Sequence, residues 1–144
     1  MTYKQVKIAV QTLLNSHPQI NDVRFATAQE WLKTEGNNDY PVCCFAINNG
    51  NLEPGYKVFS VQFWFMDLSG KDAEFELDVV SDQTEIANDI VGLLKGHTQP
   101  WEIDESISFQ VLLHKFEDYL SGVQLTVNLK IANTYDTCIS PTTL

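Results

Sequence analysis

The sequence predicts an α+β fold, with a mainly antiparallel sheet of four or five strands and one long helix packed on one face of the sheet. Two observations favour the sheet: apolar residues alternate with period two from Tyr56 to Met66, and they do so again in the last third of the chain. A third favours the helix, because apolar residues recur every three or four positions from Asp72 onward. The 144 residues correspond to one domain.

A first helix of about three turns is expected near the N-terminus, because apolar residues recur there at helical spacing. The pattern ends at residues 15–18, where Asn, Ser, His and Pro follow one another and favour helix termination. The members of the apolar stripe are Tyr3, Val6, Val10, Leu13 and Leu14.

The next segment predicts a short extended piece followed by a short second helix. Val23 and Phe25 are spaced by two, as in a strand. Thr27 and Glu30 have the spacing of a capping box, in which a hydroxyl and a carboxylate bind the free amide groups at a helix start. The second helix is therefore expected to begin there and to contain Trp31.

A pair of strands is expected in the middle of the chain. Residues 41–47 form a compact apolar run, which residues 48–51 close with a turn-like sequence, and a second breaker follows at Pro54 and Gly55. The strand that starts at Tyr56 has one wholly apolar face and one mixed face. The apolar face contains Phe59, Val61, Phe63 and Phe65, and the mixed face contains Val58, Ser60, Gln62, Trp64 and Met66.

The long helix is expected to run from Asp72 to Leu94, with its acidic residues near the start and Lys95 and Gly96 at its end, as the helix dipole and glycine termination favour. About 24 residues would span ~36 Å. Its apolar face contains Phe75, Val79, Ile86, Ile90 and Leu94, and we expect this face to pack on the sheet. An alternative is a strand through Leu77 followed by a shorter helix capped by Asp82.

The last third predicts two paired strands. One apolar series contains Ile107, Phe109, Val111 and Leu113, and the other contains Val123, Leu125, Val127, Leu129 and Ile131. The segment 114–122 between them is expected to be a charged, aromatic loop. The stretch 133–144 lacks periodicity, so we expect one domain over residues 1–132 and an extended C-terminal arm over residues 133–144.

The charge of the chain argues against binding to nucleic acids, and its apolar runs argue against a membrane span. Nine basic and nineteen acidic residues give a net charge of −10, which repels phosphate. The apolar runs are shorter than the ~20 residues of a membrane span, and the first residues lack the apolar core of a signal peptide. We therefore expect an intracellular chain with no membrane partner.

The sequence contains no motif with a known catalytic mechanism, so we expect a protein that is not an enzyme and holds no cofactor or metal. The three histidines are far apart in the sequence, and the carboxylates of residues 72–78 have the positions of a solvated helix start. Cys43, Cys44 and Cys138 form neither a disulfide framework nor a zinc motif. Neighbours on a strand point to opposite faces, so we expect no disulfide between Cys43 and Cys44. Both are expected to be small, buried, reduced thiols.

Trp64 is a candidate contact residue, because tryptophan is enriched at protein interfaces. It lies on the mixed face of its strand, so two interpretations are open: a helix covers it, or another subunit does. The loop 115–121 and the C-terminal arm have too little periodic apolar content to be held by their own domain, and we expect them to contact other subunits. The candidate interface residues are Trp64, Lys115, Phe116, Asp118, Tyr119 and Tyr135.

Over residues 1–133 the order of elements resembles the tail-terminator and neck ring proteins of tailed bacteriophages, including the small ring proteins of crAss-like phages. Three segments carry the resemblance: residues 59–68 (FSVQFWFMDL), 76–90 (ELDVVSDQTEIANDI) and 116–123 (FEDYLSGV).

The resemblance implies a tail-terminator-like fold and a virion structural protein made in the host cytoplasm. Its copies would form a homo-oligomeric ring in the head-to-tail connector or at the tail end, beside portal, neck or tail proteins. DNA would pass through this ring without specific binding. Two alternatives are a small ligand-binding domain or enzyme, and an assembly adaptor that is absent from the final particle.

Overall fold

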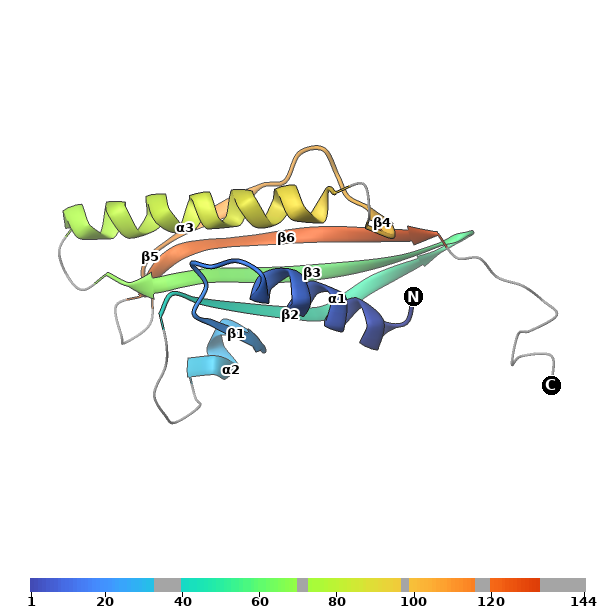
Figure 1. Cartoon of the computed structure of the whole chain (residues 1–144), viewed down its shortest axis with the longest axis horizontal. Coiled ribbons are helices and arrows are strands. Elements are labelled where there is room, and N and C mark those ends of the chain that lie inside the picture. Colours follow the sequence, from blue (N-terminus) through green and yellow to red (C-terminus); the bar gives the residue numbers. More distant parts are fainter. Residues whose placement is uncertain (33–39, 70–72, 97–98, 116–119, 133–144) are drawn as a thin grey trace.

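The computed structural model describes residues 1–32, 40–69, 73–96, 99–115 and 120–132. Two helices, α1 (Tyr3–Asn15) and α3 (Ala73–Leu94), cover one face of a mixed sheet, and the short helix α2 (Ala28–Leu32) packs on the opposite face (Figure 1). The prediction of an α+β fold with a mainly antiparallel sheet and a long helix on one face is confirmed. The C-terminal arm expected at residues 133–144 lies outside the described residues.

In the described part of the chain the sheet contains six strands rather than the four or five expected: β1 (Asp22–Phe25), β2 (Val42–Glu53), β3 (Tyr56–Leu68), β4 (Trp101–Glu102), β5 (Phe109–Lys115) and β6 (Leu120–Ala132). Its order is β1-β2-β3-β6, and both β4 and β5 pair with the far side of β6. Only the pairing of β1 with β2 is parallel among the described strands. The strand β4 has two residues, which is too short to show any periodicity.

The hairpin of β2 and β3 is longer than the sequence predicts. Residues 48–51, expected to form a turn, continue β2 after a shift in register between Ile47 and Asn49. Pairing with β3 satisfies their backbone groups and outweighs the turn preference of Asn and Gly. The chain reverses later, at Gly55, whose φ of 79° lies in the left-handed region that glycine adopts without strain.

The first two helices begin where the sequence predicts. In α1 the amide of Gln5 donates to the Thr2 hydroxyl at 3.2 Å, and the Gln5 side chain accepts from the Thr2 amide at 2.8 Å. In α2 the amide of Glu30 donates to the Thr27 hydroxyl at 3.2 Å, as the capping box requires. The apolar stripe of α1 is confirmed, and its buried members are Val6, Val10 and Leu14.

The long helix α3 is continuous over 22 residues, so the alternative of a strand through Leu77 is wrong. Ile86, Ile90 and Leu94 belong to the cluster between the helices and the sheet, as predicted, and Val79 is buried as well. The burial of Phe75 is not confirmed, since 52% of this residue is exposed. In Figure 1 the start of α3 projects beyond the ends of β3 and β6. None of the described helices has the length and hydropathy that a membrane span requires.

Two apolar clusters lie on the two faces of the sheet. On the face covered by α1 and α3, Val61, Phe63 and Phe65 are buried and Phe59 is partly buried, which confirms the predicted apolar face of β3. The ring of Phe63 stacks 5.9 Å from that of Phe65, measured between centroids. The cluster on the other face contains Ala28, Trp31, Val42, Cys44, Ala46, Trp64, Met66, Leu112 and Leu120.

The last two strands are paired antiparallel, as expected, but the loop between them is shorter than predicted. The strand β5 includes His114 and Lys115, and β6 already begins at Leu120. Residues 120–122 pair with residues 66–68 of β3, so contacts with a strand distant in sequence extend β6. The part of the predicted loop at residues 116–119 lies outside the described residues.

Candidate functional site

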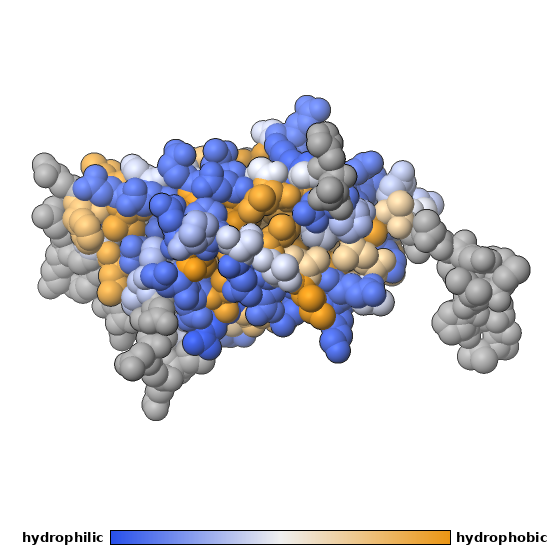
Figure 2. Space-filling model, in the orientation of Figure 1, coloured by the Kyte–Doolittle hydropathy of each residue, from blue (hydrophilic) through white to orange (hydrophobic). Residues whose placement is uncertain are grey.

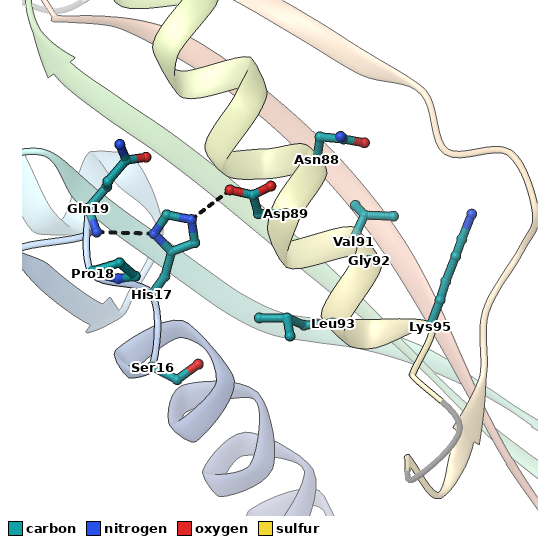
Figure 3. Close-up of a pocket in the computed structure, with 10 residues that line it drawn as sticks. All are labelled: Ser16, His17, Pro18, Gln19, Asn88, Asp89, Val91, Gly92, Leu93 and Lys95. Atoms are coloured by element: carbon teal, nitrogen blue, oxygen red, sulfur yellow. Dashed lines mark hydrogen bonds and ion pairs between the residues drawn. The ribbon is translucent and has the colours of Figure 1, made fainter.

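An open cleft lies where the segment after α1 meets the C-terminal half of α3 (Figure 3). His17 is buried at its edge, and the Nε2 atom of its ring is 3.0 Å from a carboxylate oxygen of Asp89. The Nδ1 atom of the same ring accepts a hydrogen bond from the Gln19 amide at 3.1 Å. No local pattern in the sequence indicates the pairing of His17 with Asp89, because the two residues are 72 positions apart.

The geometry gives His17 a positioning role. Because Nδ1 accepts from an amide N–H, it carries no proton, and the neutral ring carries its proton on Nε2, which donates to Asp89. A general base needs a ring nitrogen directed at a substrate, and both nitrogens of His17 are already engaged. The hydroxyl of the adjacent Ser16 donates to the Leu13 carbonyl at 2.6 Å. The pair therefore holds the segment between α1 and β1 against α3.

The side chains of the other two histidines are not among those that the structure describes. His97 lies outside the described residues, and only the backbone of His114 is described. Among the side chains that the structure places, no group of three or more His, Cys, Asp and Glu residues could hold a metal ion.

Two carboxylates are more buried than their positions in the sequence indicate. Glu76 was expected at a solvated helix start, but its side chain is buried in the structure. Burial also raises the pKa of Asp67; the negative charge of Asp82 adds to this effect, and a hydrogen bond from the Leu68 amide opposes it.

The neighbouring thiols of β2 are buried on opposite faces of the sheet, as expected. Cys43 belongs to the cluster under α1 and α3, and Cys44 belongs to the cluster under α2. Burial raises the pKa of Cys43 well above its usual value. Burial, with the nearby charge of Asp22, raises the pKa of Cys44 to about 12. Since the thiolate is the reactive form, both residues are expected to be inert.

This burial predicts slow chemical labelling. In a Cys138→Ser variant, which leaves Cys43 and Cys44 as the only thiols, we expect the native protein to react with a thiol reagent much more slowly than the urea-unfolded protein. The absorbance of the released thiolate of Ellman's reagent measures both rates. Native labelling as fast as that of the unfolded chain would contradict the burial of these thiols.

The structure places Trp64 within the second apolar cluster, where it is 9% exposed and packs with Trp31, Met66 and Leu112. The helix α2 therefore covers this part of the mixed face of β3, in agreement with one of the two interpretations of Trp64. Of the other candidate interface residues, only the backbone of Lys115 is described, at the end of β5. Phe116, Asp118, Tyr119 and Tyr135 lie outside the described residues.

Sequence reasoning missed a more open surface along β5. This strand pairs with β6 on one side only, and within the described chain no strand pairs with its other side. Residues 108–111 are all exposed although their side chains alternate between the two faces, so neither face is covered there. Phe109 is 53% exposed, and Val111 and Leu113 are exposed as well.

Apolar side chains of α3 extend this surface. Thr84 and Val91 line a groove together with Ile107 and Phe109, so this flank of the helix faces β5. Leu77 lies on the same flank, two turns before Thr84, and is exposed. In Figure 2, orange side chains reach the surface at the left end of the molecule, where α3 begins. We call β5 with Leu77 the β5 edge.

The opposite edge of the sheet is also open. The strand β1 ends the described sheet and pairs only with β2. Phe25 at its end and Tyr3 of α1 are both exposed, with their ring centroids 6.4 Å apart. The Nζ atom of Lys7 lies 5.5 Å from the centroid of the Phe25 ring. We call β1 with Tyr3, Lys4 and Lys7 the β1 edge.

Within the described residues, one subunit thus presents two edge strands, each paired on one side only and each with exposed apolar side chains. Backbone groups on such edges can pair with a strand from another molecule. The family models and the curated proteins contain no match to this chain, so the functional argument rests on these surfaces.

Proposed function

We propose that this chain is a structural protein whose copies assemble head to tail into a closed ring, at the head-to-tail junction or the tail end of a phage particle. The observation that carries the proposal is the presence of two open sheet edges on opposite sides of one subunit. Both edges carry exposed apolar residues that would be buried by a neighbour, Phe25 on one and Phe109 on the other.

Two different edges on one subunit favour a ring over a two-fold dimer. When one surface of a subunit binds a different surface of the next, the contact repeats, and it gives a ring if the rotation between copies closes. Natural proteins usually protect edge strands with charges or prolines, because open edges associate. The described side chains of β5 from Phe109 to Leu113 carry no charge and no proline.

The negative charge of the chain supports the proposal that DNA passes through the ring without being bound. A lumen rich in lysine and arginine would release counterions from every phosphate it met and would hold the DNA. The net charge of −10 gives the opposite tendency, with repulsion acting over about one Debye length, ~8 Å at physiological salt. Neighbouring portal, neck or tail proteins would then bind the two faces of the ring.

Native mass spectrometry and negative-stain electron microscopy of the purified full chain test the proposal. We expect a closed ring whose mass is an integer multiple of 16.3 kDa. A chain that stays monomeric up to the highest concentration reached would contradict it. A closed two-fold dimer would also contradict it, because a dimer leaves no repeating contact.

A further inference from the structure

We infer that neighbouring copies in the ring are joined by antiparallel pairing of β5 of one copy with β1 of the next, so that their sheets become continuous. This inference rests on the proposed self-assembly and names the two surfaces that meet. It commits to a second copy of this chain as the occupant of the β5 edge.

The directions of the strands allow this junction. The strand β1 is parallel to β2, and each step from β2 to β3, from β3 to β6 and from β6 to β5 reverses direction. Three reversals make β5 antiparallel to β1 of its own subunit. Copies related by rotation about an axis along the strands keep this relation, so β5 meets the next β1 in the antiparallel arrangement, which is slightly more stable per residue than a parallel pair.

The exposed apolar side chains of the two edges lie on the same face of the sheet. Phe25 pairs in register with Phe45 of the cluster under the helices. Phe109 and Val111 pair with Leu125 and Val123 of that same cluster. Directly paired residues point to one face of a sheet, so the junction would bring Phe25 of one copy beside the apolar side chains of β5 of the other.

The charges favour pairing of a β1 edge with a β5 edge over pairing of two β1 edges or two β5 edges. Lys4 and Lys7 are one turn apart on α1, on the flank above β1, whereas Asp22 of β1 is neutralised by Arg24 at 2.9 Å. The segment leading into β5 carries Asp104 and Glu105, both exposed. Opposite charges select which surfaces meet, and like charges facing each other are unfavourable.

The antiparallel direction also brings these charges to the same end of the junction. The C-terminal end of β1, where Lys7 lies over Phe25, would be beside the N-terminal end of β5. Asp104 and Glu105 precede that end of β5 by a few residues. Strand direction, apolar faces and charge therefore agree on one arrangement.

A charge exchange between copies tests the inference. The first variant carries Lys4→Glu and Lys7→Glu, and the second carries Asp104→Lys and Glu105→Lys. Each variant alone has two edges of like charge and should lose the ring, leaving monomers in native mass spectra. An equimolar mixture should regain assemblies in which the two variants alternate, closing into rings with an even number of copies, because each altered edge then meets an edge of opposite charge.

A matched control carries Asp78→Lys and Asp82→Lys. Both residues are exposed one turn apart on α3, on the flank away from β5, and this control should form rings as the parent chain does. Circular dichroism checks that every variant is folded. If the first variant is unfolded, the milder pair Lys4→Gln and Lys7→Gln replaces it and should weaken the ring.

The outcomes separate the inference from the proposed function. A monomeric parent chain would overturn the proposed ring. A ring-forming parent with both variants still forming rings alone would overturn this junction and leave the ring intact. If the first variant associates when it is measured by itself and the second does not, two β5 edges pair with each other. If the two folded variants stay monomeric when mixed, the β1 and β5 edges are not complementary. Either result overturns the inference.

Discussion

Gly122→Ala should destabilise the protein by about 3 kcal/mol, more than most single methyl additions, because the new methyl group has no space between β6 and β3. A Cβ atom at this position would lie 1.8 Å from the backbone oxygen of Phe65 and 2.9 Å from its carbonyl carbon. Backbone atoms of a paired strand cannot rotate away as a flexible side chain can. The strands would have to separate, and the ladder between them runs from Leu68 and Leu120 to Tyr56 and Ala132.

Gly92→Ala is the matched control for this substitution. Gly92 lies in α3 and is exposed, and apart from its chain neighbours and the backbone of its own helix, a Cβ atom there would have no heavy atom within 4 Å. Alanine loses less conformational freedom than glycine in a helix, so this change should stabilise the protein by about 0.5–1 kcal/mol. Urea titrations followed by tryptophan fluorescence, at one protein concentration, compare the two. Equal midpoints for the Gly122→Ala variant and the parent chain would contradict the close approach of β6 to β3.

Gly122 also shows why the end of one strand was not predictable. Glycine after serine is a signal for a turn, so the local pattern predicts a loop at Gly122. In the structure the position requires glycine because another backbone passes close to it, which is the second common use of glycine in strands. The local pattern is the same in both cases. What distinguishes them is Met66, which pairs with Gly122 although it is distant in the sequence.

The helices were predictable because their signals are local. The spacing of Val6, Val10 and Leu14 and the capping residue Thr27 are read within a few positions of the chain. Phe75 follows the same helical spacing as Val79, yet Phe75 is exposed and Val79 is buried. Periodicity shows which side of a helix is apolar, and the length of the neighbouring element determines how much of that side is covered.

The exposure of the β5 edge could not be predicted from the sequence for a similar reason. The series of Phe109, Val111 and Leu113 alternates as strictly as the buried series of β3, and the sequence gives no sign that nothing covers it. That property follows from the sheet order, in which β5 is an edge. Trp64 is a candidate contact residue because it is a tryptophan on the mixed face of β3, yet it is buried in the cluster that contains Trp31 of α2 and Leu112. Exposure depends on contacts between distant segments.

Two adjacent leucines at the end of α3 differ in burial, so substituting each of them tests the packing of α3 on the sheet. Leu94 is 1% exposed and belongs to the cluster between the helices and the sheet, whereas Leu93 is 41% exposed. The carbonyl of Leu94 also accepts a hydrogen bond from Nε1 of Trp101 at 2.9 Å, which links this end of α3 to β4. A substitution of either side chain leaves that carbonyl in place, so the comparison reports on side-chain burial alone.

Leu94→Ala should therefore lower the free energy of unfolding by about 2–5 kcal/mol, from the lost transfer energy of the side chain plus the cavity that remains. Leu93→Ala removes the same atoms from a position already in contact with water, and its cost should stay below about 1 kcal/mol. Both variants have the same helix propensity change, so the difference between them measures the contacts of α3 with the sheet. Urea titration by circular dichroism, with the protein concentration held constant, gives both values. Similar losses for the two variants would mean that this end of α3 does not pack on the sheet.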